Sequence, residues 1–150
     1  VKTSISGSSY TLIVIERESM RQDIVIDAKL IKNTIELEGK IAIYGIYFDT
    51  GKSIIKEASE PALKQIADYL KNNSTVNCWV VGHTDADGAF QLNSKLSLDR
   101  AVAIKTALQT NYNIPEHRLF AEGVGPLAPI ASNDTEEGKK LNRRVELVKK

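Results

Sequence analysis

The sequence is poor in several features that would point to a class of protein at once. Its single cysteine, Cys78, excludes a disulfide within the chain, and the apolar run VNCWVVG around it predicts a buried thiol. No apolar stretch is long enough to cross a bilayer, and none is expected to be a signal peptide. Because the chain begins at Val1 rather than Met, we expect a processed form or a piece excised from a longer protein.

An excess of charge of one sign is also missing. The sequence has 20 Lys and Arg residues and 19 Asp and Glu residues, so its net charge is +1, and it has no basic stripe with interleaved aromatic residues. Nucleic acid and anionic membranes are therefore not expected as direct partners. The only two histidines, His83 and His117, lack the partner spacing of a metal site. We expect no metal and no cofactor.

The hydrophobic pattern of the 150 residues predicts one domain-sized α+β or α/β fold, with helices packed on a mixed sheet. From Lys40 onward, strand-like and helix-like segments alternate in the order β-α-β-α-β-α-β. The strands are expected at 40–49, 75–81, 119–124 and 143–149, and the helices at 57–72, 89–110 and 136–141. This region, 40–150, is expected to form the main domain.

Residues 1–39 are interpreted as an N-terminal extension made of strand and helix. Alternating apolar residues predict a strand from Tyr10 to Glu16, and a short run from Asp23 to Ile26 follows it. A helix is expected at 28–38, capped by Asp27 and ended by Gly39.

Helical spacing also predicts which side chains face the core. Leu63, Ile66, Ala67 and Leu70 share one face of the helix at 57–72. The other inward-facing positions are expected at Leu30, Ile31, Thr34 and Leu37 in the first helix, and at Leu98, Ala101, Val102, Ala107 and Leu108 in the longest one. Trp79, in an apolar strand, is expected in the core or under a helix.

Hydrogen-bonding groups are concentrated in the stretch VVGHTDADGAFQLNSKLSLDRA, from Val80 to Ala101. Asp85 follows the end of a predicted strand, where open α/β sheets place ligands. Asn93 and Arg100, seven residues apart, return to nearly the same side of the following helix, close to Leu96. The spacing permits two arrangements. Asp85 and Arg100 either form a salt bridge that ties loop to helix, or line a pocket that binds a ligand with an ammonium and a carboxylate.

Several motifs together resemble the OmpA-like peptidoglycan-binding domain, which occurs in outer-membrane protein A, the peptidoglycan-associated lipoprotein and flagellar stator proteins. The motifs are IYFDTGKSIIK at 46–56, GHTDADG at 82–88, N-x-x-LS-x-x-RA at 93–101 and NRRVE at 142–146. They cover about 110 residues in the family's order and spacing. The resemblance implies a two-layer sandwich with helices packed on a mixed four-stranded sheet.

The resemblance also implies a ligand, the meso-diaminopimelate residue of the peptidoglycan stem peptide, and a set of residues that bind it. Asp85 would take the ammonium and Arg100 the carboxylate. The other residues implied at the site are Thr84, Asn93 and Leu96 as its lining, Arg143 as a support from the last strand, and Phe48 and Asp49 at its rim.

Three positions raise questions beside the family pattern. The loop reads HTDADG rather than the more frequent HTDNTG, and Asp87, the extra acid, is interpreted as a turn residue that faces water. Asp99 is expected to pair with a neighbouring cation. Arg143 and Arg144 alternate along a predicted strand, so only one of them is expected to face the pocket.

The function implied is non-catalytic: the domain anchors an outer-membrane or periplasmic protein to the cell wall. It implies a periplasmic location next to the outer membrane of a Gram-negative cell, with membrane attachment through other parts of the host protein. One alternative is an envelope assembly or oligomerisation module, for example a homodimer, in which the pocket is vestigial. The other is a cell-wall hydrolase using His83, Asp85 and Asp87. No catalytic residue is expected, because a paired acid and base in a known arrangement is missing.

Overall fold

The computed structural model describes residues 26–150. The strand predicted from Tyr10 to Glu16 and all but the last residue of the run from Asp23 to Ile26 lie outside this range. From Lys40 the predicted order of strands and helices is confirmed. The elements are α1 (Ala28–Glu38), β1 (Lys40–Ile43), a 3-10 turn (Glu57–Ser59), α2 (Glu60–Asn72), β2 (Cys78–His83), α3 (Phe90–Tyr112), a second 3-10 turn (Glu116–Arg118), β3 (Leu119–Gly125), α4 (Glu136–Asn142) and β4 (Val145–Lys149).

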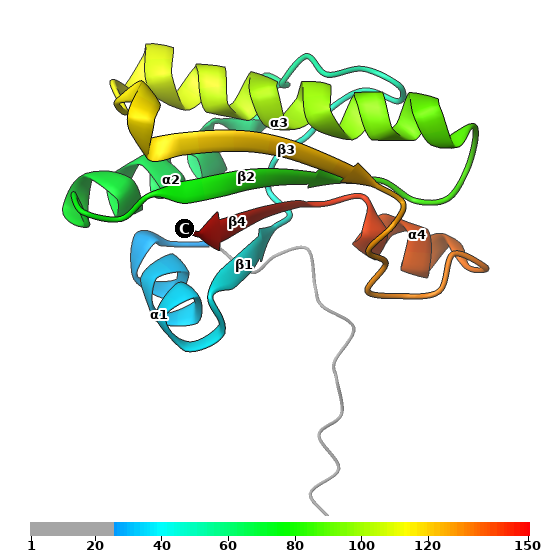
Figure 1. The fold of residues 1–150 in the computed structure, drawn as a ribbon, viewed down its shortest axis with the longest axis horizontal. Helices are drawn as coiled ribbons and strands as arrows, with labels where there is room; N and C mark the ends of the chain where they lie inside the picture. The colour runs from blue at the N-terminus through cyan, green and yellow to red at the C-terminus, as the bar shows by residue number, and fades with distance from the viewer. Residues whose placement is uncertain (1–25) are drawn as a thin grey trace, which may run out of the picture.

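The strands of the described region form one mixed sheet in the order β1-β4-β2-β3, which confirms the predicted fold class. The β2 and β3 strands are parallel and joined by α3, whereas β4 is antiparallel to both β1 and β2. In Figure 1 the strands lie side by side, α3 runs along β3, and α2 lies behind the strands. The short α4 lies near the end of the sheet where β2 finishes and β4 begins.

Helix α1 packs into the same core as the rest of the domain. Asp27 caps it by accepting a hydrogen bond from the Leu30 amide, and Gly39 ends it in the left-handed conformation, both as predicted. Ile31 is buried as predicted and Thr34 is half-buried, but Leu30 and Leu37 are exposed, and the second buried residue is Ile35, which the prediction missed. The helix contacts both α2 and β1. The boundary predicted at residue 39 stays a prediction, but it does not separate two cores.

The predicted inward face is confirmed for α2 and only in part for α3. All four apolar residues predicted on α2 are buried. On α3, Ala101 and Leu108 are buried as predicted, but Leu98 and Val102 are exposed. The buried stripe of α3 consists of Ser97, Ala101, Ile104 and Leu108. The sequence prediction was misled because a serine forms part of the inward face and two large apolar residues do not.

Strand β1 ends at Ile43, six residues before the predicted end. Beyond it the chain leaves the sheet and bonds to the segment that precedes α2. The Tyr47 amide donates to Ser59 Oγ over 2.8 Å, and the Tyr47 carbonyl accepts from the Lys56 amide over 3.0 Å. Phe48 and Ile55 form only an isolated antiparallel bridge. The segment 44–56 is therefore a folded-back loop rather than a strand, and it reaches α3.

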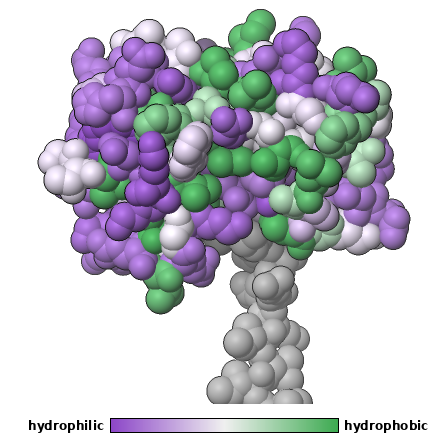
Figure 2. Space-filling view, viewed as in Figure 1, coloured by the Kyte–Doolittle hydropathy of each residue, from purple (hydrophilic) through white to green (hydrophobic). Residues whose placement is uncertain are grey.

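The face of the sheet opposite the core carries half-buried apolar side chains. Successive strand residues point to opposite faces, so Trp79 and Val81 point away from buried Cys78 and Val80. The prediction that Trp79 lies in the core or under a helix was therefore wrong. Its ring lies 5.0 Å from that of Phe120. Figure 2 shows hydrophobic residues gathered across the middle of the visible face.

Candidate functional site

The loop 84–88 begins where β2 ends, and hydrogen bonds hold its conformation. Thr84 donates its amide to the Gly125 carbonyl over 3.0 Å and its hydroxyl to the Asp85 carbonyl over 2.8 Å. The Asp87 amide donates to Asp85 Oδ1 over 3.0 Å, which forms a tight turn. Asn93 Nδ2 donates to the Asp87 carbonyl over 2.7 Å. Asn93 is thus a support for the loop, and Thr84 and Asp85 are buried within it.

Two glycines determine how close α3 comes to this loop. A Cβ at Gly82 would lie 2.0 Å from the Ser97 carbonyl oxygen, and a Cβ at Gly123 would lie 2.3 Å from the Leu98 amide nitrogen. Only glycine fits such approaches, so the main chain of α3 rests directly on β2 and β3. This contact brings the helix residues Asn93 and Arg100 to the carboxyl end of β2.

Asp85 pairs with Arg143, not with Arg100. Arg143 Nη1 lies 2.7 Å from Asp85 Oδ2, and its other terminal nitrogen lies 2.7 Å from Glu136 Oε1. Burial lowers the pKa of Arg143, but the hydrogen bonds to Asp85 and Glu136 outweigh it and raise the pKa. Among residues 26–150 no ion pair joins Asp85 to Arg100. The salt-bridge alternative for that pair is therefore not the arrangement found in the structure.

Arg100 holds the loop 44–56 against α3. Its Nε donates to the Lys52 carbonyl over 2.9 Å, and one terminal nitrogen donates to the Asp49 carbonyl over 3.3 Å. The guanidinium carbon lies 4.9 Å from the centre of the Phe48 ring, a cation–π distance. Burial lowers the pKa of Arg100, the nearby Asp85 carboxylate raises it and Arg143 lowers it. Arg100 also lines one cavity with Arg143, the partner of Asp85.

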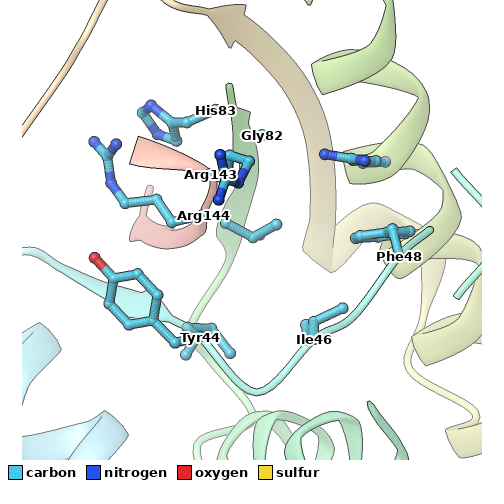
Figure 3. Close-up of a pocket in the computed structure, with 10 residues that line it drawn as sticks. Tyr44, Ile46, Phe48, Gly82, His83, Arg143 and Arg144 are labelled. Carbon is cyan, nitrogen blue, oxygen red and sulfur yellow. The ribbon is translucent and has the colours of Figure 1, made fainter. Parts of the chain in front are cut away.

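A cavity of about 30 Å³ lies between the ends of β1, β2 and β4. Its lining includes Phe48, Arg100 and Arg143 from the predicted site, with Tyr44, Ile46, His83 and Arg144. In Figure 3, His83, Arg143 and Arg144 lie on one side and Ile46 and Phe48 on the other. The volume is enough for about two water molecules, so any larger ligand would have most of its atoms outside this cavity.

Both arginines of the NRRVE motif line the cavity, so the prediction that only one faces it was wrong. Strand alternation does not apply to them, because β4 begins at Val145 and Arg143 is the C-terminal cap of α4. Arg144 is buried, with 4% of its surface exposed. Its guanidinium donates to the Ala128 carbonyl and to Glu146.

A buried ion network, two of whose members line the cavity, was not recognised from the sequence. Glu146 Oε1 accepts from Arg144 Nε over 3.0 Å, and Glu146 Oε2 lies 3.4 Å from His83 Nε2. Contacts with His83 and then Arg144 outweigh burial and lower the pKa of Glu146 to about 2. His83 is therefore part of a buried structural network. Residues 26–150 hold no group of three His, Cys, Asp or Glu side chains that could bind a metal.

The other five predicted residues do not line this cavity: Thr84, Asp85 and Asn93 belong to the loop 84–88 and its support, and Leu96 and Asp49 lie elsewhere. Leu96 is half-buried on α3, and Asp49, whose carboxylate lies 3.2 Å from Lys56 Nζ, is exposed in the loop 44–56. Asp87 faces water as predicted, with 67% of its side chain exposed, and it pairs with Lys139 over 3.0 Å. Asp99 pairs with Lys95, one helical turn away. The roles of the eight predicted residues in binding stay predictions.

Comparison with known proteins connects this site to one family. A model of the OmpA family matches residues 47–143. The outer membrane protein Omp38 of Acinetobacter baumannii is 41% identical over 100 residues, which are 67% of this chain and 28% of that protein. The chain therefore spans less than a third of this relative's length.

Solved structures show the same fold. The peptidoglycan-associated lipoprotein of Burkholderia pseudomallei superposes with a TM-score of 0.65 at 26% identity, covering 83% of this chain and 100% of that chain. A MotB-like protein of Desulfovibrio vulgaris gives a TM-score of 0.66 at 26% identity, with 74% of this chain and 72% of that chain covered. None of the helices between residues 26 and 150 combines the length and the apolar character needed to cross a membrane.

Proposed function

Because the chain belongs to the OmpA family, we propose that it binds the peptidoglycan stem peptide through the zwitterionic end of meso-diaminopimelate and so anchors its host protein to the cell wall. Asp85 binds the ammonium group and Arg100 binds the carboxylate. Leu96 and Phe48 line the space between them, Thr84, Asn93 and Arg143 fix the acid, and Asp49 shapes the rim. The domain acts in the periplasm, next to the outer membrane.

The observation that carries this proposal is the separation of opposite charges at one site. Arg100 lines the same cavity as Arg143, the partner of Asp85, yet Asp85 and Arg100 are each held by other groups, so neither neutralises the other by direct contact. A ligand with an ammonium and a carboxylate complements both. The Burkholderia relative is named a peptidoglycan-associated lipoprotein, which agrees with this choice of partner.

The network already present at Asp85 predicts modest affinity. Arg143 already donates to Asp85 Oδ2, and the Asp87 amide donates to Oδ1. An incoming ammonium therefore adds a further hydrogen bond to oxygens that already accept one. A carboxylate oxygen has more than one acceptor direction, which makes this addition feasible. Selectivity then comes from matching both charges at once, because a ligand without the second amine leaves Asp85 without its ligand partner.

Calorimetric titration with purified stem peptides tests the proposal. A peptide ending in meso-diaminopimelate should bind, and the matching lysine peptide, which lacks the distal carboxylate, should bind at least about ten-fold more weakly. Asp85→Asn and Arg100→Lys should each weaken binding about ten- to a hundred-fold, because one removes the anion and the other the two-point fork.

Asp99→Asn is the matched control, since Asp99 pairs with Lys95 on the outer side of α3. It should leave the affinity unchanged. Failure of the folded, unmodified chain to bind either peptide would contradict the proposal. Incubation with intact sacculi should release no fragments, whereas release would favour the hydrolase alternative. Light scattering tests the homodimer, which stays a prediction.

A further inference from the structure

Helix α4 presents a row of charged side chains to the loop 84–88. Glu136, Lys139 and Arg143 are spaced by three and four residues, which places them on one side of a helix and its cap. Arg143 pairs with Asp85, and Lys139 pairs with Asp87 over 3.0 Å. Each acid of the loop therefore has a cation of α4 as its partner.

Glu136 is the one member of this row that does not contact the loop. It accepts a hydrogen bond from Arg143 over 2.7 Å, the same length as the bond from Arg143 to Asp85. The guanidinium is thus shared between two carboxylates. Glu136 is 70% exposed at its side chain, and it lies in the first turn of α4, where a negative charge is favourable.

The connected network has a net negative charge only because of Glu136. Three carboxylates, those of Asp85, Asp87 and Glu136, face two cations, Lys139 and Arg143. Without Glu136 the two loop acids and the two cations would cancel. The ammonium of a ligand at Asp85 would then approach a neutral network in which Arg143 is compensated by Asp85 alone.

We propose that Glu136 is a specificity-determining residue: by sharing the Arg143 guanidinium, it preserves the attraction of Asp85 for an ammonium group. The inference rests on the proposed function, because it concerns the amine of the same ligand. Glu136 does not contact the ligand; it acts through Arg143. Its effect should therefore be specific to charged amines, and it should weaken as salt screens the exposed carboxylate.

The test compares two variants with two probes. Glu136→Gln keeps the shape of the side chain and removes its charge. Glu137→Gln, the matched control, removes the same charge from the neighbouring exposed residue, which also lies in the first turn of α4 but has no ion-pair partner among residues 26–150. The probes are a stem peptide ending in meso-diaminopimelate and the same peptide with its distal amine acetylated.

We expect Glu136→Gln to weaken binding of the free-amine peptide about three- to ten-fold at low salt, and Glu137→Gln to change it less than about two-fold. The loss should shrink in 0.5 M salt, because the Debye screening length there lies between roughly 3 and 10 Å, so the exposed carboxylate is largely screened. The acetylated peptide, bound through its carboxylate alone, should lose no affinity from Glu136→Gln. Circular dichroism checks that both variants fold alike.

Equal affinities of Glu136→Gln and the unmodified chain for the free-amine peptide would overturn the inference and leave the proposed function standing. Equal losses for both peptides would also overturn it, because they would show a general change of the site rather than of amine recognition. Absence of binding by the unmodified chain would instead overturn the proposed function, and this inference with it.

Discussion

The chain segment 142–146 takes part in two ion networks, which differ in their exposure to water. In the buried network, Arg144 and Glu146 are 4% and 6% exposed. In the exposed network, the Arg143 side chain is 37% exposed and that of Glu136 is 70% exposed. Adjacent arginines therefore have different roles. The buried pair of Arg144 and Glu146 fixes the path of the chain, and we propose that Arg143 with Glu136 sets the charge that a ligand meets.

The difference follows from solvation. Removing one partner from a buried ion pair leaves an uncompensated charge in a poorly solvated environment, which is far more destabilising than the same change at the surface. The buried network can therefore vary little without damage to the fold. The exposed network tolerates substitution, so it is the place where the recognition properties of the site can change.

The largest effect should come from breaking the buried network. Glu146→Gln leaves Arg144 without its carboxylate, and we expect the free energy of unfolding to fall by about 3 kcal/mol, the range seen when one partner of a buried pair is removed. Chemical denaturation measures this value. Glu122→Gln, an exposed acid on β3, is the control, and a loss below about 1 kcal/mol at Glu146 would show that the burial of the pair matters little.

Acid should reveal the same network in the unmodified chain. The folded-state pKa of Glu146 is lowered to about 2, below the value of about 4.3 for an exposed glutamate. Its contribution to stability is present above the unfolded pKa and is lost as the pH falls through the folded pKa. Between about pH 4.5 and 2, the unmodified chain should lose up to about 3 kcal/mol more than Glu146→Gln does. Parallel pH profiles for the two proteins would contradict this.

The smallest effect on stability should come from the exposed network. Lys139→Met breaks the pair with Asp87, and we expect the free energy of unfolding to fall far less than in Glu146→Gln, because exposed pairs contribute little. Thermal unfolding at low and high salt measures it. A loss as large as that of Glu146→Gln would remove the distinction between the two networks.

The sequence predicted the order of elements and the core face of α2 because the apolar spacing there is regular and uninterrupted. It failed where contacts with distant segments decide the outcome. The end of β1 depends on Ser59, a residue twelve positions beyond Tyr47, and the face of α1 depends on where α2 and β1 happen to lie. Propensity and periodicity contain no information about such neighbours.

The candidate site shows the same limit. Its residues were identified from motifs, but the partner that each residue contacts could not be predicted from spacing. Arg143 faces Asp85 because it caps α4, and Arg144 is buried because β4 starts one residue later. Glu136 and Lys139 carry no motif signal of their own. Their role became visible only when the loop and the helix, about 50 residues apart in the chain, were seen together.

The contact of α3 with Gly82 and Gly123 has a consequence for how this domain can vary. The distance from the strand end to Arg100 depends on main chain resting against main chain, with no side chain between them to shrink or grow. Substitutions among the exposed side chains can change the charge of the site and its ligand preference in small steps. The width of the site, by contrast, stays constant until one of those two glycines is replaced, and then the whole helix must move.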